Sequence, residues 1–384
     1  MTEAQAPVKP WRLYGAAALS AVMLALAYEH EWLPYLVLVA LVPWLGAIRG
    51  SRRRHAAVSA MVFGVVLFGF QMFWVVPFVT RWTGSLVMGI LPLVVVQLLA
   101  AIVYVPLGLG LKWASRGWRV WLLPLVWVSH EVLRSYLPEL AFPWAFAATP
   151  LVAHPQWVQH AAWGTVWLVS ATVVLFNLGI LWVLDARRSA WQPGKIATAF
   201  GVALGLPLLA ATRLAAPEPS SKMRFTLGQH GYDMSVEQKA GIELALEEFT
   251  NKAVLRANSD KSDLLVFPEG YSRTTATTGP PDTPLGENPM VPAMFGSFRE
   301  QDGHMYQAAY LYDGKWQHSD KTKLVVFGEF VPFREQIPLL QSFHLTPVDL
   351  TPGTNLSVLP YRDKVIGPMV CFEGVFPELG VKEA

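Results

Sequence analysis

Three residues with catalytic chemistry lie beside short apolar runs in the second half of the sequence: Glu269, Lys321 and Cys371. The neighbouring runs, which we predict to be β-strands, are Leu264–Phe267, Leu324–Phe327 and Val365–Val370. A residue at the end of a strand lies at the edge of its sheet, where clefts for ligands form. The spacing therefore predicts that the three side chains face one cleft.

A thiol, a carboxylate and an ammonium group are a sufficient set for acyl transfer. The thiolate attacks a carbonyl carbon, the carboxylate takes the thiol proton and later returns it to a leaving group, and the ammonium stabilises the tetrahedral oxyanion. Cys371 is the single cysteine of the sequence, so no intramolecular disulfide can form. The residues alone also fit a plainer interpretation, in which Glu269 and Lys321 are surface charges and Cys371 is a small buried apolar residue.

The composition divides the chain into two parts that meet different solvents. Of its 384 residues, 53% are hydrophobic and 15% are charged, whereas about a quarter of an ordinary soluble protein is charged. Six of the 28 acidic residues lie in 1–212, and the other 22 lie in 213–384. We therefore predict a transmembrane domain at 1–212, a linker at 213–222 and a water-exposed domain at 223–384. The net charge of +2 gives no indication of nucleic-acid binding.

Seven segments of the first part are candidates for membrane-spanning helices, each of which needs roughly 20 mostly apolar residues because hydrocarbon cannot satisfy an open backbone. They are Trp11–Tyr28, Trp32–Ile48, Ala56–Val79, Leu86–Leu111, Val120–Leu133, Val158–Leu184 and Ile196–Ala211.

The loops between these segments predict an orientation. The basic residues of one set of alternate loops are Lys9, Arg12, Arg49, Arg52, Arg53, Arg54, Lys112, Arg116, Arg119, Arg187, Arg188 and Lys195. The opposite set holds Arg81 and Arg134. Basic residues stay on the cytoplasmic side of a membrane, so we expect a cytoplasmic N-terminus. Seven crossings then place the residues after Arg213 outside the cytoplasm.

Two features of the membrane part have more than one interpretation. Glu131 and Arg134 lie three residues apart on one helix face and could pair; intramembrane charges are candidates for function, but these lie near a helix end and could be structural. The segment Ser135–Trp157 is rich in aromatic residues and proline. It fits an aromatic belt at the membrane interface or, alternatively, a rim where lipid enters.

The second part has the pattern of an α/β or α+β domain. Arg224–Gly228 and Met305–Tyr312 predict further strands, and Ser235–Ala257 predicts an amphipathic helix. Thr274–Pro292 is rich in Thr, Pro and Gly and predicts a loop.

Three stretches of this second part resemble a known family. Leu265–Glu269 resembles the strand of the nitrilase superfamily that ends in the catalytic glutamate. Lys321 followed by Leu324–Phe333 is similar to the lysine and "LVPFGEFVP" motif of apolipoprotein N-acyltransferases, with Val326 in place of proline. Val370–Glu373 resembles the "CYE" nucleophile motif of that family.

The membrane part carries the same resemblance, so the likeness covers most of the chain. Trp127–Arg134 and Phe142–Trp144 are similar to the family's "E-x-L-R … FPW" stretch, and Phe68–Trp74 resembles its third span. The resemblance implies about seven spans followed by a nitrilase-like αββα sandwich. Family members continue through further strands and a final span, whereas this sequence ends at Ala384, thirteen residues after Cys371. We therefore expect the catalytic domain to be C-terminally incomplete.

The resemblance also implies a reaction. Cys371 would take the sn-1 acyl chain of a phospholipid, with phosphatidylethanolamine as the expected donor, and pass it to the α-amino group of a diacylglyceryl-cysteine at a lipoprotein N-terminus. Glu269 would be the general base and acid, and Lys321 the oxyanion stabiliser. No metal or organic cofactor is expected, and the location would be the bacterial inner membrane with the catalytic domain on the periplasmic side.

Three supporting residues complete the expected site. Glu329 and Glu373 would be carboxylates near the nucleophile, and Phe372 replaces the usual tyrosine and so lacks its hydroxyl. Two alternatives remain open at this point. One is a membrane-tethered carbon–nitrogen hydrolase that uses the same residues on a small amide. The other is an inactive remnant that binds lipoproteins or lipid.

Overall fold

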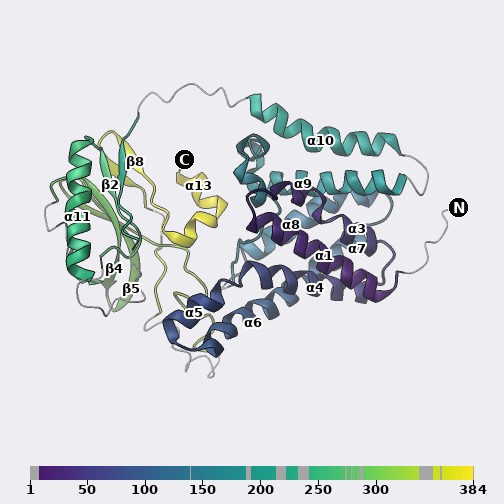
Figure 1. The fold of residues 1–384 in the computed structure, drawn as a ribbon, viewed down its shortest axis with the longest axis horizontal. Coiled ribbons are helices and arrows are strands. Elements are labelled where there is room, and N and C mark those ends of the chain that lie inside the picture. The colour runs from purple at the N-terminus through teal and green to yellow at the C-terminus, as the bar shows by residue number, and fades with distance from the viewer. Residues whose placement is uncertain are drawn as a thin grey trace. The chain divides into compact units, whose positions relative to one another are not determined.

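The computed structural model divides the chain into two compact units, Met1–Pro217 and Glu218–Ala384 (Figure 1). It describes residues 8–138, 140–186, 192–212, 222–231, 242–272, 275–277, 279, 281–283, 285, 289–336, 349–354 and 357–383. The predicted linker 213–222 lies outside the described residues except for Lys222.

The regular secondary structure described in the first unit is all helical. Its α-helices are α1 (Pro10–Glu29), α2 (Val37–Ala40), α3 (Val42–Ile48), α4 (Arg53–Gln71), α5 (Val75–Thr83), α6 (Leu86–Val103), α7 (Val105–Ala114), α8 (Leu123–Ser135), α9 (Ala161–Ala186) and α10 (Pro193–Ala211). Short 3-10 helices are η1 (Pro34–Leu36), η2 (Gly117–Leu122), η3 (Thr149–Ala153) and η4 (Pro155–Trp157).

Five stretches among the described residues are long and apolar enough to cross a membrane. They are Pro10–Glu29, Arg53–Gln71, Leu86–Ala114, Ala161–Ala186 and Pro193–Ala211. Each overlaps one of the seven predicted spans.

The two remaining predicted spans form shorter helices. Trp32–Ile48 is divided among η1, α2 and α3. Val120–Leu133 is divided between η2 and α8, and the 13 residues of α8 extend over roughly 20 Å, against about 30 Å for the hydrocarbon core. Five of the seven predicted helices are thus long enough, and seven crossings stay a prediction.

A buried asparagine explains how the backbone tolerates the break between α2 and α3. The Asn177 side chain, on α9, accepts a hydrogen bond from the Leu41 amide at 2.9 Å and donates one to the Val37 carbonyl at 2.9 Å. Asn177 is fully buried. Since apolar surroundings offer few other partners to an open backbone group, this side chain satisfies two of the groups that the break leaves open, and Ser20 accepts a hydrogen bond from a third, the Trp44 amide, at 3.1 Å.

Close helix packing in this unit depends on small residues. A Cβ atom added to Gly108 of α7 would lie 2.5 Å from the Ala56 carbonyl oxygen of α4. Without a hydrophobic driving force between helices in lipid, such close backbone approach supplies the packing energy.

Glu131 and Arg134 are both buried on α8. No ion pair joins these two described residues, and each instead hydrogen-bonds the segment that follows, which favours the structural interpretation. The Arg134 guanidinium donates hydrogen bonds to the Trp144 and Ala145 carbonyls. The Glu131 carboxylate accepts one from the Ala147 amide at 2.8 Å. The charges therefore anchor the segment after α8 from its inner side.

The second unit is built on a mixed sheet. Its described elements are β1 (Phe225–Leu227), α11 (Ile242–Ser259), β2 (Leu264–Val266), β3 (Thr275–Ala276), β4 (Ala293–Gln301), β5 (His304–Tyr312), β6 (Trp316–Asp320), β7 (Leu359–Tyr361), β8 (Lys364–Ile366), η7 (Cys371–Val375) and α13 (Pro377–Glu383). The large sheet has the order β1-β2-β4-β5-β6, with β3 beside β4, and β7 and β8 form a separate hairpin. The β1–β2, β2–β4 and β3–β4 pairs are parallel, whereas β4–β5 and β5–β6 are antiparallel.

The large sheet is covered on both faces. Leu246 of α11 packs with Phe295 and Tyr310 on one face. On the other face Leu311 packs with Tyr361 of the β7–β8 hairpin. The coarse prediction of helices followed by an α/β domain is confirmed.

Some predicted elements are confirmed and others are wrong. The strands β1, β2 and β5 lie where the sequence predicts them, and the described part of the helix predicted at Ser235–Ala257 runs from Ile242 to Ser259. Leu324–Phe327 forms a turn with an isolated bridge between Val326 and Phe330, and not a strand.

Two further segments differ from the prediction in part. Of Val365–Val370, only the beginning is a strand, because β8 ends at Ile366. The predicted loop Thr274–Pro292 is described only in part, and its described residues include the short strand β3.

Candidate active site

Glu269 lies in the turn that follows β2, where β4 passes very close. The Gly296 amide of β4 donates a hydrogen bond to the Pro268 carbonyl at 3.1 Å. A Cβ atom on Gly296 would lie 2.6 Å from the Cα atom of Glu269, which is closer than real contacts allow. Glycine at position 296 is therefore what lets the glutamate turn sit against the sheet.

Lys321 follows β6 and is held at both backbone groups. Its amide donates a hydrogen bond to the Gln307 carbonyl at 2.8 Å, and its carbonyl accepts one from the Gly353 amide at 2.8 Å. The side chain is fully buried. Its Nζ lies 2.6 Å from Glu329 Oε1 and 3.5 Å from Glu269 Oε1, so the ammonium joins two carboxylates.

Glu329 reaches this ammonium because the chain turns back after Lys321. The Glu329 amide donates a hydrogen bond to the Val325 carbonyl, and the Val325 amide donates one to Glu329 Oε2 at 2.9 Å. The Leu350 amide donates to the Glu329 carbonyl at 2.8 Å. A strand at Leu324–Phe327 would carry the carboxylate away from the lysine. The turn that replaces the predicted strand therefore brings Glu329 to Lys321.

Cys371 opens η7 and is exposed. Its φ angle of 51° lies in the left-handed region, which residues other than glycine rarely adopt and which is common at functional sites. The Glu269 carboxylate is close enough to the thiol to raise its pKa. The structure therefore places the thiol of Cys371, the carboxylate of Glu269 and the ammonium of Lys321, the three groups predicted from the sequence, in one cluster.

Glu373 ties the cysteine loop to the lysine loop. Its Oε1 accepts hydrogen bonds from the Thr322 amide at 2.7 Å, the Thr322 hydroxyl at 2.7 Å and the Lys323 amide at 3.2 Å. Its Oε2 accepts one from the Val370 amide at 2.9 Å. Because Glu373 is buried, this carboxylate positions the two loops and is not available as a base.

Two shifted pKa values describe the electrostatics of the site. Burial lowers the pKa of the Lys321 ammonium, but the charges of Glu329 and Glu269 outweigh it, and the pKa ends above its ordinary value. Loss of hydration raises the pKa of the Cys371 thiol; Glu269 raises it further, while Lys321 opposes the shift. The resting state is therefore a charged lysine and a protonated thiol. A thiol that attacks a carbonyl from this state needs a base, and Glu269 is the carboxylate whose charge acts most on the thiol.

Phe372 does not contribute a polar group. It is buried, and its ring centroid lies 5.3 Å from that of Phe376 in an edge-to-face contact. Sequence reasoning did not single out Thr322 or Gly296, because a hydroxyl beside a lysine and a glycine within a strand carry no signal of their positioning roles.

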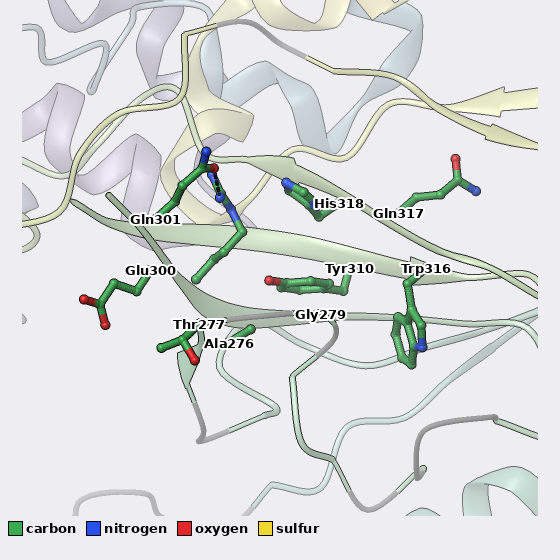
Figure 2. A pocket seen from close by; sticks show the side chains of 10 residues that line it. Ala276, Thr277, Gly279, Glu300, Gln301, Tyr310, Trp316, Gln317 and His318 are labelled. Carbon is green, nitrogen blue, oxygen red and sulfur yellow. Dashed lines mark hydrogen bonds between the residues drawn. The ribbon is translucent and has the colours of Figure 1, made fainter. Parts of the chain in front are cut away.

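A separate pocket of about 310 Å³ lies on the other face of the sheet, lined by residues of β3 to β6 (Figure 2). Tyr310 pairs with His318, and both line the pocket. Lys321 lies three residues beyond His318, so its side chain points to the opposite face. Among the described lining residues there is no member of the cysteine, glutamate and lysine set.

A Cys, Glu and Lys cluster on a mixed sheet, in a chain that also holds several apolar helices, has the chemistry expected of an acyl-transfer or amide-cleaving site in a multi-pass membrane protein. Residues 20–179 match the model of the apolipoprotein N-acyltransferase N-terminal domain. The apolipoprotein N-acyltransferase of Geobacter metallireducens is 30% identical, over 96% of this chain and 74% of its own length. That of Pseudomonas syringae pv. tomato is 27% identical, over 97% and 76%. The chain belongs to the apolipoprotein N-acyltransferase family and is an acyltransferase of lipoprotein biosynthesis.

Proposed function

We propose that this protein moves the sn-1 acyl chain of a phospholipid to the α-amino group of an S-diacylglyceryl-cysteine lipoprotein, through a thioester on Cys371. The observation that supports the proposal is the buried Lys321 ammonium, which hydrogen-bonds Glu329 and Glu269, together with a Glu269 carboxylate close enough to Cys371 to raise the pKa of its thiol. Phosphatidylethanolamine is the proposed acyl donor.

In the first half-reaction, Glu269 takes the thiol proton as Cys371 Sγ attacks the ester carbonyl carbon, and the carbonyl oxygen becomes an oxyanion. The oxyanion collapses and the carbon–oxygen ester bond breaks. Glu269 then gives its proton to the departing glycerol oxygen, which leaves as a lysophospholipid hydroxyl. The acyl chain stays on the sulfur as a thioester.

The second half-reaction runs through the same groups. The lipoprotein α-amino group attacks the thioester carbonyl carbon, and Glu269 takes one of its protons. The carbon–sulfur bond breaks, the thiolate recovers a proton from Glu269, and the product is an amide. Lys321 stabilises the oxyanion in both halves, with Glu329 holding the ammonium in place.

The surrounding architecture in this proposal is a membrane part with seven crossings and a cytoplasmic N-terminus. The catalytic unit is a nitrilase-like sandwich on the periplasmic side of the bacterial inner membrane. The alternating basic loops support this orientation, since Arg52, Arg53 and Arg54 fall on one side while Arg81 falls on the other.

A two-stage labelling experiment tests the proposal. The protein is reconstituted in vesicles with a phospholipid that carries an isotopic label in its sn-1 chain, and Cys371 is examined by mass spectrometry. We expect an acyl adduct on Cys371 and its discharge to an amide when a diacylglyceryl-cysteine peptide is added. Cys371→Ala is expected to abolish both.

Each other outcome contradicts a part of the proposal. An adduct that survives Cys371→Ala excludes this cysteine as the nucleophile. An adduct that water discharges, but that the peptide does not, indicates a hydrolase. Wild-type protein with no adduct on any lipid excludes acyl transfer.

A further inference from the structure

The hydrogen bonds of Lys321 leave few donors for an oxyanion. A lysine ammonium has three N–H groups. In the described part of the chain two of them are directed at carboxylates, those of Glu329 and Glu269. One N–H group is left for the developing negative charge, whereas oxyanion sites ordinarily present at least two preorganised donors.

Gln307 lies directly across the sheet from this lysine. The Lys321 amide donates to the Gln307 carbonyl at 2.8 Å, which continues the β5–β6 ladder by one step beyond the Ala308 and Asp320 pair. Directly opposite residues of an antiparallel pair point to the same face, with Cβ atoms about 5 Å apart. The Gln307 side chain therefore rises beside the Lys321 side chain.

The Gln307 side chain has an unused donor in this position. The residue is 3% exposed, and its Nε2 is buried without a hydrogen-bond partner in the described part of the chain. A buried amide that lacks a partner destabilises the fold, and a catalytic role is one reason for which native proteins retain such a group. Tyr310 also has a buried unpartnered hydroxyl, but it belongs to the opposite face and cannot serve this site.

We propose that the Gln307 carboxamide is a second oxyanion donor beside Lys321. Nε2 donates a hydrogen bond to the acyl carbonyl oxygen, and this bond strengthens as Cys371 Sγ or the acceptor amine attacks and the oxygen becomes negative. No covalent bond of Gln307 changes. The inference rests on the proposed function, because it needs an acyl carbonyl on Cys371.

The test is Gln307→Met, which keeps an unbranched side chain of similar length and removes the donor. The rate of thioester formation at saturating phospholipid is expected to fall about 10²-fold, with an unchanged KM for the lipid. The midpoint of thermal unfolding is expected to stay or rise, because the unpartnered amide is gone. A merely structural glutamine would not combine a lower kcat with equal or higher stability.

Gln317→Met is the matched control on the neighbouring strand. Its Nε2 donates to Asp313 Oδ1 at 3.2 Å and to the Pro360 carbonyl at 3.0 Å. The same substitution there removes satisfied hydrogen bonds, so the unfolding midpoint is expected to fall while the rate of thioester formation stays at the wild-type value.

Gln307→Glu provides a second variant in case the methionine protein folds poorly. It replaces the donor by a negative charge next to the oxyanion, and we expect a larger loss of rate than with methionine. Wild-type rates in both Gln307 variants, or losses that only follow unfolding, overturn the inference while the Cys371 adduct of the wild type stands. A wild type without that adduct overturns the proposed function itself.

Discussion

One carboxylate relates the three residues of the proposed mechanism, because Glu269 hydrogen-bonds the Lys321 ammonium and raises the pKa of the Cys371 thiol. Its negative charge raises the pKa of the thiol, so Glu269 suppresses the thiolate in the resting protein, while in the proposed mechanism it is also the base for the reaction. The two roles can be separated by measuring thiol ionisation and acyl transfer in the same variant.

Glu269→Gln is therefore expected to change the two measurements in opposite directions. The pKa of Cys371 falls toward its ordinary value, so a larger fraction is thiolate at pH 7 and alkylation by iodoacetamide becomes faster. Acyl transfer falls by about 10²–10⁴-fold because the general base is missing. Alkylation rates measured between pH 6 and pH 10 give the pKa in each protein, and slower alkylation of the variant at pH 7 would contradict the assignment.

At the scale of elements, β4 contacts the turn that holds Glu269 at Gly296, where there is no room for a side chain. Gly296→Ala places a methyl group 2.6 Å from the Glu269 Cα atom, so the turn has to move. We expect a loss of about 1–3 kcal/mol in unfolding free energy and a fall of about 10²-fold in acyl transfer, because a displacement of about 1 Å is enough for that.

The control for this change is Gly380→Ala in α13, where an added Cβ meets nothing within 4 Å. Alanine is the better helix former by up to about 1 kcal/mol, so this variant should be as stable as the wild type or more so, with full activity. Equal behaviour of the two variants in denaturation and acyl-transfer assays would show that the close contact at Gly296 is unimportant.

The sequence predicts the elements that have a clear apolar pattern and misses the others. The apolar run Leu264–Phe267 marks β2 and so locates Glu269. The strand β6, Trp316–Asp320, is absent from the prediction because a run of Trp, Gln, His, Ser and Asp has no apolar alternation; its pairing with β5 determines it. Such pairing between strands cannot be predicted from the residues of one segment alone.

Apolar composition also fails to distinguish a turn or a broken helix from a regular element. Leu324–Phe327 is as apolar as a strand, yet its backbone turns so that Glu329 can bond Lys321. Trp32–Ile48 is as apolar as a span, yet it breaks where Asn177, far along the chain, satisfies the open backbone groups. In both cases a polar side chain outside the segment hydrogen-bonds the irregular backbone.

At the scale of the whole molecule, the single cysteine is a natural probe of orientation. In the proposed arrangement Cys371 faces the periplasm, so a membrane-impermeant maleimide added to spheroplasts should label it. Arg53→Cys in a Cys371→Ala background is the control, because its thiol lies in a predicted cytoplasmic loop and should react only after permeabilisation. Labelling that requires permeabilisation in the wild type and not in the control would reverse the orientation.

The buried lysine between two carboxylates has a consequence for how the reaction responds to its surroundings. Before attack, the Lys321 cation and the anions of Glu269 and Glu329 sum to one negative charge; after attack, the proton has moved to Glu269 and the same single charge is on the substrate oxygen. The total charge of the cluster is thus conserved, and no counterion has to enter or leave. The rate of thioester formation should consequently vary little with ionic strength. The binding of a charged lipid headgroup, by contrast, weakens as salt screens its charge.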